Sequence, residues 1–334
     1  MDKVASFSQN QRSQLFRETA ARRSISPAII EKDFWVCWVL KRMFLASDLR
    51  DHIVFKGGTS LSKVFGLIER FSEDIDLILD WRLLGYGPGD LDPYEDQPSN
   101  TQQDRFNRQF NEKTVKYIVD TLCPQLTELL GSCPSVKVSI DPNDGQLIHI
   151  AYPATFPEEY LRPEIRLEIG PLASFAPSES HTIKPFAAQE FPNVFDSPDC
   201  PVVTITAERT FWEKATILHQ QTYRTNAIPA RYARHYYDIY QLAKSPVRIS
   251  ALSDLKLLAD VVAFKSRFYR CSWAQYDKAK PGSLRLVPDD ARMKELRADY
   301  RKMEIMIFGE VPSFDEIIRA LHKLEDEINN MYIE

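Results

Sequence analysis

The stretch that decides the fold is Phe55-Lys56-Gly57-Gly58-Thr59-Ser60-Leu61-Ser62-Lys63, followed by Arg70-Phe71-Ser72-Glu73-Asp74-Ile75-Asp76-Leu77. The glycine pair lets the backbone come close to a polyphosphate. The hydroxyls of Thr59 and Ser60, at a helix start, add donors where backbone N–H groups are free. We therefore predict that Gly57, Gly58, Thr59 and Ser60 bind phosphate.

The second half of the stretch carries two carboxylates. Asp74 and Asp76 are two residues apart in an apolar run, so on a strand both side chains leave the same face while Ile75 and Leu77 enter the core. Such a pair can hold one or two Mg²⁺ ions against phosphate oxygens. Taken alone, a Gly-Gly turn is usually only a turn and an Asp-x-Asp pair is usually solvated charge. Their order in one segment favours a functional site.

The order of strand, Gly-Gly-Thr turn, helix and Asp-x-Asp strand resembles the signature of the nucleotidyltransferase superfamily. More narrowly, residues 55–77 resemble the AbiEii/AbiGii toxin family of prokaryotic nucleotidyltransferases. Three further segments support this match, namely Ile30-Glu31-Lys32-Asp33, Phe211-Trp212-Glu213-Lys214-Ala215 and Arg234-His235-Tyr236-Tyr237-Asp238-Ile239-Tyr240. The 15 residues between Gly58 and Asp74 are slightly more than in the compact superfamily form, which indicates a longer intervening helix or turn.

The expected fold class is α+β, with a nucleotidyltransferase-type mixed sheet, flanking helices and a mainly helical C-terminal half. We expect one domain over residues 1–205 and a helical domain over 206–334. The expected helices cover residues 8–22, 27–44, 60–69, 105–130, 206–220 with Thr206 as N-cap, and 229–243. The expected strands cover residues 52–55, 75–79, 135–140, 147–152 and 163–169, and residues 85–103 are expected to form a loop.

The resemblance implies a third catalytic carboxylate on a strand antiparallel to the Asp-x-Asp strand. Residues 163–169 alternate cleanly, and Glu168 matches best by its place next to Gly170. Glu164 is the rival on the same face. A Glu-Arg-Glu ladder with no catalytic role is the alternative.

In the helical half, the resemblance implies that Lys214 contacts nucleotide phosphate and that Asp238 acts near the active site. Asp238 would orient Lys214 or Arg234, or only stabilise its helix through Arg234, one turn away. Ser72 is expected either to hydrogen-bond a phosphate or to cap the strand. Arg70 is expected to assist the site or to pair with Glu69 or Glu73.

The charge distribution bears on the partner. The formal net charge is -5, yet residues 208–280 contain 13 Lys and Arg against 6 Asp and Glu. Aromatic residues are interleaved there, namely Tyr223, Tyr232, Tyr236, Tyr237, Phe268, Tyr269 and Trp273. Basic and aromatic side chains together are typical of a surface that binds RNA, although solvated basic helix faces are also common.

Composition narrows the class of protein. With 334 residues and 44% hydrophobic residues, the chain can bury a full core. The longest early apolar stretch, residues 34–45, is too short to span a bilayer, and no signal peptide is evident, so we expect a cytoplasmic protein without membrane contact. The five cysteines are scattered without Cys-x-x-Cys spacing, so neither a disulfide framework nor a zinc site is indicated.

The predicted site residues are expected to catalyse the transfer of a nucleoside monophosphate from a nucleoside triphosphate (NTP) to an acceptor hydroxyl. Asp74, Asp76 and Glu168 are expected to hold two Mg²⁺ ions. The resemblance implies a toxin of a toxin–antitoxin or abortive-infection (phage defence) system, some members of which extend the 3′ end of tRNA. A cognate antitoxin is then a possible partner. The alternatives are a small-molecule nucleotidyltransferase of the antibiotic-modifying sort, and a nucleotide-binding regulator without transfer activity.

Overall fold

The structure, a computed structural model, describes residues 1–45, 48–72, 74–87, 93–95, 97–156, 162–171 and 175–331. The chain divides into two compact units: unit 1 comprises residues 1–64 and 72–205, and unit 2 comprises residues 65–71 and 206–334. The sequence assigned residues 65–71 to the first domain, whereas they belong to unit 2. That each unit folds as an independent domain stays a prediction.

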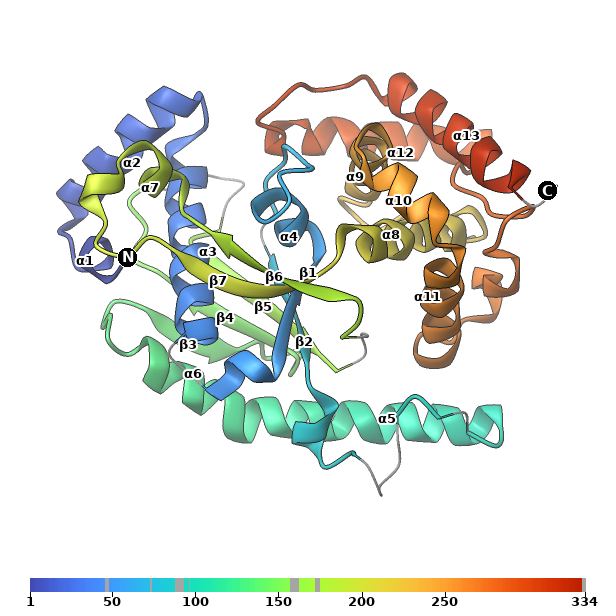
Figure 1. The fold of residues 1–334 in the computed structure, drawn as a ribbon, viewed down its shortest axis with the longest axis horizontal. Coiled ribbons are helices and arrows are strands. Elements are labelled where there is room, and N and C mark those ends of the chain that lie inside the picture. The colour runs from blue at the N-terminus through green and yellow to red at the C-terminus, as the bar shows by residue number, and fades with distance from the viewer. Residues whose placement is uncertain are drawn as a thin grey trace. The chain divides into compact units, whose positions relative to one another are not determined.

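A mixed seven-stranded sheet forms the core of unit 1 (Figure 1). The strand order is β3-β4-β5-β2-β1-β7-β6. The strands are β1 (Ile53–Lys56), β2 (Asp74–Leu79), β3 (Lys137–Ile140), β4 (Leu147–Ala151), β5 (Glu164–Gly170), β6 (Ser178–Ile183) and β7 (Cys200–Ile205). The α+β class expected from the sequence is confirmed.

The neighbours of β2 decide which side chains share its polar face. β1 runs antiparallel to β2, with Lys56 opposite Asp76. β5 runs parallel to β2, with Arg166 opposite Asp74 and Glu168 opposite Asp76. The expectation of an antiparallel strand for the third carboxylate is therefore wrong. The helices after β2 lead into β3, and the successive antiparallel pairs β3-β4 and β4-β5 then bring β5 back parallel to β2.

Two strands were not expected from the sequence. β7 lies parallel to β1, with Thr204 opposite Phe55, and the Thr204 hydroxyl donates to the Phe55 carbonyl (2.9 Å). β6 is an edge strand paired antiparallel with β7, and most of its residues are exposed. A polar edge strand lacks the apolar alternation on which a sequence-based prediction depends.

Helices cover this sheet. α3 (Pro27–Leu45) packs against β7 and β5, and α2 (Gln9–Arg23) and α7 (Phe186–Glu190) pack against α3. Nearly every residue of α3 after its first turn is buried, including its two tryptophans. α1 (Asp2–Ala5) precedes α2 at the N-terminus. A helix that is apolar around its circumference belongs in a core.

The expected helix between the glycine turn and β2 is shorter than predicted. α4 spans Gly57–Lys63, so it begins at the glycine pair itself and ends six residues before the predicted end. The expected helix over residues 105–130 consists of α5 (Asn100–Tyr117), a π-helical turn (Ile118–Leu122) and α6 (Cys123–Leu130). Of the expected loop over 85–103, residues 88–92 and 96 lie outside the described residues.

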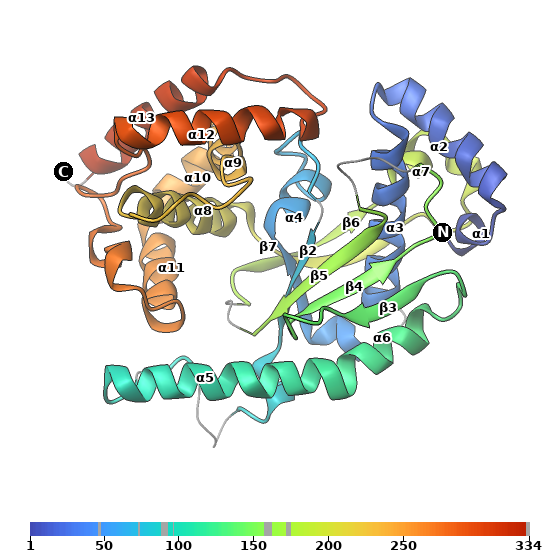
Figure 2. The same cartoon turned by 180° about the vertical axis from the view of Figure 1, so that it is seen from behind.

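Unit 2 is built of helices, which Figure 2 shows from behind. They are α8 (Ala207–Thr222), α9 (Arg234–Lys244), α10 (Val247–Ser253), α11 (Leu255–Phe268), α12 (Asp290–Met303) and α13 (Phe314–Asn330). Thr206 caps α8 by accepting from the Arg209 N–H, as expected. Within the described ranges, none of the helices combines the length and the hydropathy that a bilayer span requires.

Candidate active site

The predicted site residues fall into two groups, one in each compact unit. Unit 1 holds the glycine turn, Ser72 and the carboxylates of β2 and β5, and unit 2 holds Lys214 and Asp238. Ser72 is half-buried, two residues before Asp74, and Glu73 lies outside the described residues.

Gly57 is required by the position of Asp76. Its φ is +84°, a left-handed conformation that other residues adopt only with strain. A Cβ placed on Gly57 would lie 1.9 Å from Asp76 Oδ2. The glycine therefore lets a catalytic-type carboxylate lie directly against the backbone of the turn.

The hydroxyls of the turn are engaged with the protein itself. Thr59 Oγ1 donates to the carbonyl of Asp74, and Ser60 Oγ donates to the carbonyl of Gly57 (2.9 Å). Each hydroxyl has one hydrogen to donate, so in this structure neither is available to a phosphate. Their contacts instead hold α4 against the start of β2. The donors left for an anion are the backbone N–H groups of the first turn, which have no partner within a helix.

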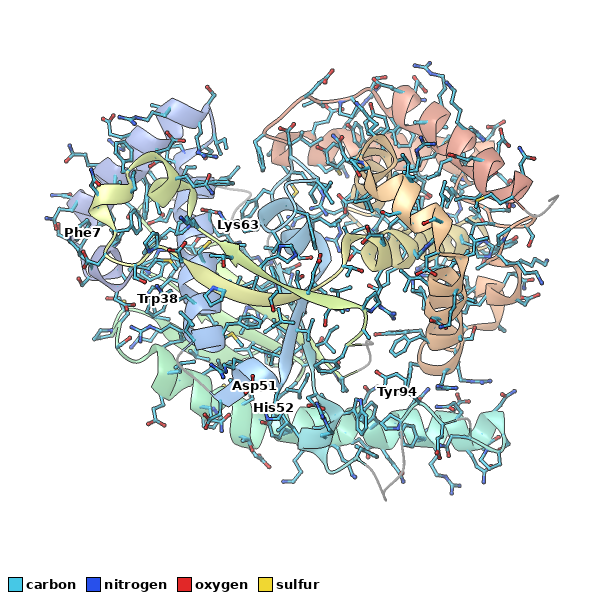
Figure 3. The ribbon with its side chains drawn as sticks, in the orientation of Figure 1. Phe7, Trp38, Asp51, His52, Lys63 and Tyr94 are labelled. Atoms are coloured by element: carbon cyan, nitrogen blue, oxygen red, sulfur yellow. The ribbon has the colours of Figure 1, made fainter. Side chains whose placement is uncertain are left out.

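The far end of α4 is also fixed. Lys63, labelled in Figure 3, lies with its Nζ 2.5 Å from Asp33 Oδ1, and both side chains are at most 6% exposed. The other oxygen of Asp33 accepts from the Phe186 N–H (2.7 Å). Glu31, two residues earlier on α3, accepts from the N–H groups of Thr155 and Phe156. The Glu31-Lys32-Asp33 segment thus anchors α4, the start of α7 and the loop after β4 to α3.

One face of β2 and β5 carries the charged cluster. Arg166 Nη1 lies 3.5 Å from Asp74 Oδ1, and its Nη2 lies 3.7 Å from Glu168 Oε1. Glu168 lies opposite Asp76 in the sheet register, and its side chain is 47% exposed. An exposed carboxylate beside Asp76 is accessible to a substrate.

Glu164, the rival for the third carboxylate, is placed differently. The register pairs Asp74 with Arg166, so Glu164 lies beyond the end of β2. His149 of β4 lies with its Nδ1 3.2 Å from Glu164 Oε1. The geometry therefore favours Glu168 over Glu164.

The carboxylates of β2 fit a divalent cation. Asp74 Oδ1 is buried but accepts no hydrogen bond from the residues that the structure describes. A buried carboxylate oxygen without a donor is costly unless a cation balances it, and Arg166 supplies only a charge at 3.5 Å. Mg²⁺ prefers oxygen ligands and is commonly held by one or two carboxylates together with substrate phosphates.

Three protein ligands do not converge here. Among the described residues, no three His, Cys, Asp or Glu side chains are gathered closely enough to hold a metal ion. Asp74, Asp76 and Glu168 therefore form no three-carboxylate cluster in this structure. Their assignment as joint metal ligands stays a prediction.

In unit 2, Asp238 of α9 binds two cations. Arg70 Nε lies 2.7 Å from Oδ1 and Arg70 Nη2 lies 2.7 Å from Oδ2, so the pair is bidentate. Lys214 Nζ of α8 lies 2.8 Å from the same Oδ2. Asp238 is fully buried, and the side chains of Arg70 and Lys214 are 3% and 8% exposed. Asp238 thus orients Lys214, one of the roles that the sequence left open.

Two of the other expected ion pairs can be compared with the described residues. Among the described residues, Arg234 is not an ion-pair partner of Asp238, and Arg70 pairs with Asp238 rather than with Glu69. Glu73 lies outside the described residues. A bidentate contact to a residue 168 positions away leaves no local pattern in the sequence.

Burial and charge shift the titration of this group. The pKa of Asp238 is lowered even though burial alone would raise it, because Arg70 and Lys214 stabilise the carboxylate. Burial lowers the pKa of Lys214, with Asp238 opposing and Arg70 adding to the shift. Burial, Lys214 and Arg234 lower the pKa of His235 well below its ordinary value, so that imidazole is neutral at neutral pH. Burial is thus the main cause of the lowered pKa of Lys214, and the opposing charges of Asp238 and Arg70 act on it in turn.

Comparisons with known proteins identify relatives of this chain. A family model described as "Nucleotidyl transferase AbiEii toxin, Type IV TA system" matches residues 38–320. No curated protein matches the chain. Among solved structures, the chain is similar to MenT4, a nucleotidyltransferase toxin from Mycobacterium tuberculosis H37Rv, at 17% identity and a TM-score of 0.46, over 96% of this chain and 99% of that one. It is also similar to JHP933 from Helicobacter pylori, at 14% identity and a TM-score of 0.37, over 88% and 89% of the two chains.

Proposed function

Because the chain belongs to the AbiEii family of nucleotidyltransferase toxins of type IV toxin–antitoxin systems, we propose that it transfers a nucleoside monophosphate from an NTP to RNA, with tRNA as the acceptor and Mg²⁺ as the cofactor. The observation that carries the proposal is the carboxylate pair of β2, with Asp76 lying against Gly57 of the phosphate-binding turn. A carboxylate pair beside a phosphate-binding turn suits metal-assisted phosphoryl chemistry.

Asp74 and Asp76 would hold the metal, with Glu168 as the third ligand once substrate is present. When bound, Mg²⁺ supplies Lewis-acid stabilisation of the negative charge on the phosphoryl oxygens. The backbone N–H groups of Gly57, Gly58, Thr59 and Ser60 would hold the outer phosphates, and Ser72 would add a hydroxyl.

In the transfer step, the oxygen of the acceptor hydroxyl forms a bond to the α-phosphorus as the bond from that phosphorus to the leaving pyrophosphate breaks. Glu168 would accept the hydroxyl proton, because it lies opposite Asp76 in the sheet and its side chain is 47% exposed. Lys214 would stabilise the charge that develops on pyrophosphate, with Asp238 orienting its ammonium.

Lys214 is suited to that role by its charge and its partners. An ammonium has three N–H donors, and of the described residues only Asp238 lies within bonding distance of Nζ. Because Arg70 also binds Asp238, the Lys214 ammonium is not the only counter-charge of that carboxylate and keeps donors for an anion such as pyrophosphate. Low solvent exposure strengthens the attraction relative to a surface lysine.

The distribution of charge and aromatic residues supports an RNA acceptor. Residues 264–285 contain six Lys and Arg against one Asp, in a chain of net charge -5. Of the interleaved aromatics, Tyr232, Tyr236, Tyr237 and Phe268 are buried core residues, whereas Tyr269 and Trp273 are 48% and 40% exposed. Exposed aromatic rings beside basic side chains stack bases and attract phosphates.

Cation–π contacts hold several basic side chains of this region against aromatic rings. The Arg224 guanidinium lies 5.7 Å from the ring centre of Trp273, and Lys278 and Arg285 each lie 5.7 Å from that of Tyr223.

A type IV toxin has an antitoxin as its partner. We place the reaction in the cytoplasm, where tRNA and NTPs are available, and we propose a role in defence against phage.

The test is incubation of the purified protein with total tRNA, Mg²⁺ and each α-³²P-labelled NTP in turn, with Asp76→Ala as control. Label on tRNA from wild type alone is the expected result, and it would also identify the preferred base. Label on a small molecule added in place of tRNA, with none on tRNA, would indicate the antibiotic-modifying alternative. NTP binding without any transfer would indicate a regulator and overturn the proposal.

A further inference from the structure

Arg70 lies in a segment that belongs to unit 2, although it is flanked on both sides by unit 1. Residues 65–71 form this segment, and only three residues separate Arg70 from Asp74 in the sequence. Its backbone is tied to the chain after α12, because Phe71 N–H donates to the Met306 carbonyl (2.8 Å) and Phe308 N–H donates to the Glu69 carbonyl (2.9 Å). Arg70 therefore enters the buried cluster from a fixed backbone.

The guanidinium of Arg70 occupies both oxygens of Asp238. Its Nη1 also donates to the Phe71 carbonyl (3.0 Å), which fixes the plane of the fork. Lys214 shares only Oδ2, at 2.8 Å. A carboxylate paired with Lys214 alone would cancel the lysine's charge, whereas a carboxylate already neutralised by an arginine leaves that charge in excess.

The charged groups around Lys214 come from several elements. Arg70 faces it from segment 65–71, and Asp238, Arg234 and the neutral His235 face it from α9. On the α11 side, Lys265 donates to the backbone carbonyl of Glu213, the residue before Lys214 (2.8 Å). Among the described residues, Arg70 and Lys214 are the cations that form ion pairs with Asp238.

We propose that Arg70 is a positioning residue of the transfer reaction, which holds Asp238 in a bidentate contact so that Asp238 orients the Lys214 ammonium without cancelling its charge. The inference rests on the proposed function, since it assigns to Lys214 the phosphate of the leaving group. It makes the segment before Asp74 part of the catalytic apparatus. The competing role is a purely structural one, in which Arg70 only fastens the segment to α9.

The sign of the pH dependence separates these roles. Lys214 acts when protonated, so the rate falls as pH rises through its pKa. The positive charge of Arg70 lowers that pKa and the negative charge of Asp238 raises it. Arg70→Gln is therefore expected to move the basic limb of the rate–pH profile to higher pH, and Asp238→Asn to move it to lower pH.

The experiment measures kcat and KM for NTP against pH in wild type, Arg70→Gln, Arg70→Lys and Asp238→Asn, with thermal melting of each variant. Arg301→Gln, which removes a charge from an exposed position of α12 in the same unit, is the control. We expect kcat/KM to fall about 10-fold or more in Arg70→Gln, which is less than the loss of about 10²–10³-fold for a donor that contacts the reacting group directly. The basic limb of the rate–pH profile should move in opposite directions in Arg70→Gln and Asp238→Asn. In Arg70→Lys this limb should stay at the wild-type pH, while kcat should be lower than in wild type.

A folded Arg70→Gln with wild-type kcat/KM and an unmoved limb would overturn the inference, as would limb shifts of the same sign in Arg70→Gln and Asp238→Asn. If Arg70→Gln does not fold, a wild-type kcat in Arg70→Lys would overturn it. If wild type transfers to no acceptor, the proposed function fails on its own. The affinity for inorganic pyrophosphate, measured by calorimetry against pH in the same variants, then decides the inference by the same opposite shifts.

Discussion

The carboxylate face of β2 and β5 and the buried cluster around Asp238 handle charge in opposite ways. On the carboxylate face, Asp74 and Glu168 are 17% and 47% exposed and their contacts with Arg166 are 3.5 Å or longer. In the cluster, Arg70, Lys214 and Asp238 are at most 8% exposed and bond at 2.7–2.8 Å. Carboxylates that are only loosely paired can take up a cation and substrate, whereas a tight buried cluster presents one cation in a fixed orientation.

This contrast separates effects on chemistry from effects on folding. A half-exposed carboxylate contributes little to stability, because water solvates it in both states. A buried ion pair that loses one partner leaves an uncompensated charge, which is strongly destabilising. Variants of the carboxylate face should therefore lose transfer but keep their stability, whereas variants of the cluster should lose stability as well as transfer.

The largest effect is expected from Asp76→Ala. Loss of a metal-binding carboxylate removes electrostatic stabilisation of the transition state, and we expect transfer to fall by about 10³-fold or more, with melting nearly unchanged. Asp51→Ala, an exposed aspartate of the same unit, is the control. Transfer at the wild-type rate in Asp76→Ala would contradict the assignment.

Asp238→Ala should instead lower stability. Removal of the carboxylate takes away the buried counter-charge that Arg70 and Lys214 share, so the free energy of unfolding should fall by about 3–5 kcal/mol. Urea unfolding measures it, with Asp289→Ala, whose side chain is 74% exposed, as the control. An unfolding curve that matches that of the control would show that the cluster is not stabilising.

Gly57→Ala is expected to lower both the stability of the fold and the rate of transfer. The substitution places a Cβ at +84° φ against Asp76 Oδ2, so we expect stability to fall by about 1–3 kcal/mol and Asp76 to be displaced, with transfer reduced about 100-fold. Gly85→Ala is a matched control, because Gly85 has φ of +81° but no heavy atom within 4 Å of the added Cβ. Equal transfer rates in the two variants would mean that the strain of a positive φ at alanine, and not the clash of its Cβ with Asp76, lowers the transfer rate.

The smallest effect is expected from Ser72→Ala. A single hydroxyl donor to phosphate contributes about 0.5–1.5 kcal/mol, so kcat/KM should fall by no more than about 10-fold. The transfer assay over a range of NTP concentrations measures this. A loss as large as that of Asp76→Ala would place Ser72 among the essential groups.

Local patterns predicted the glycine turn, the shared face of Asp74 and Asp76 and the N-cap at Thr206. These features depend on residues close in the chain, where periodicity and capping are direct signals. The family resemblance singled out Lys214 and Asp238, and the structure brings them into contact.

What the sequence did not reveal depends on distant residues. The parallel direction of β5 follows from the path of the crossover, and β6 has an exposed, polar pattern that does not alternate. The two hydroxyls expected to bind phosphate donate to backbone carbonyls of β2 and of the turn itself. The contact of Arg70 with Asp238 spans 168 residues, so neither residue signals the other locally.

The central claim is that the carboxylates of unit 1 and Lys214 of unit 2 act on the same NTP. A double-mutant cycle tests it most directly, with kcat/KM for transfer measured in wild type, Asp76→Asn, Lys214→Gln and the double variant. Residues that act in one site are not additive, so we predict that the double variant loses clearly less than the product of the two single losses. A loss equal to that product would show that the two groups act independently and would contradict the account.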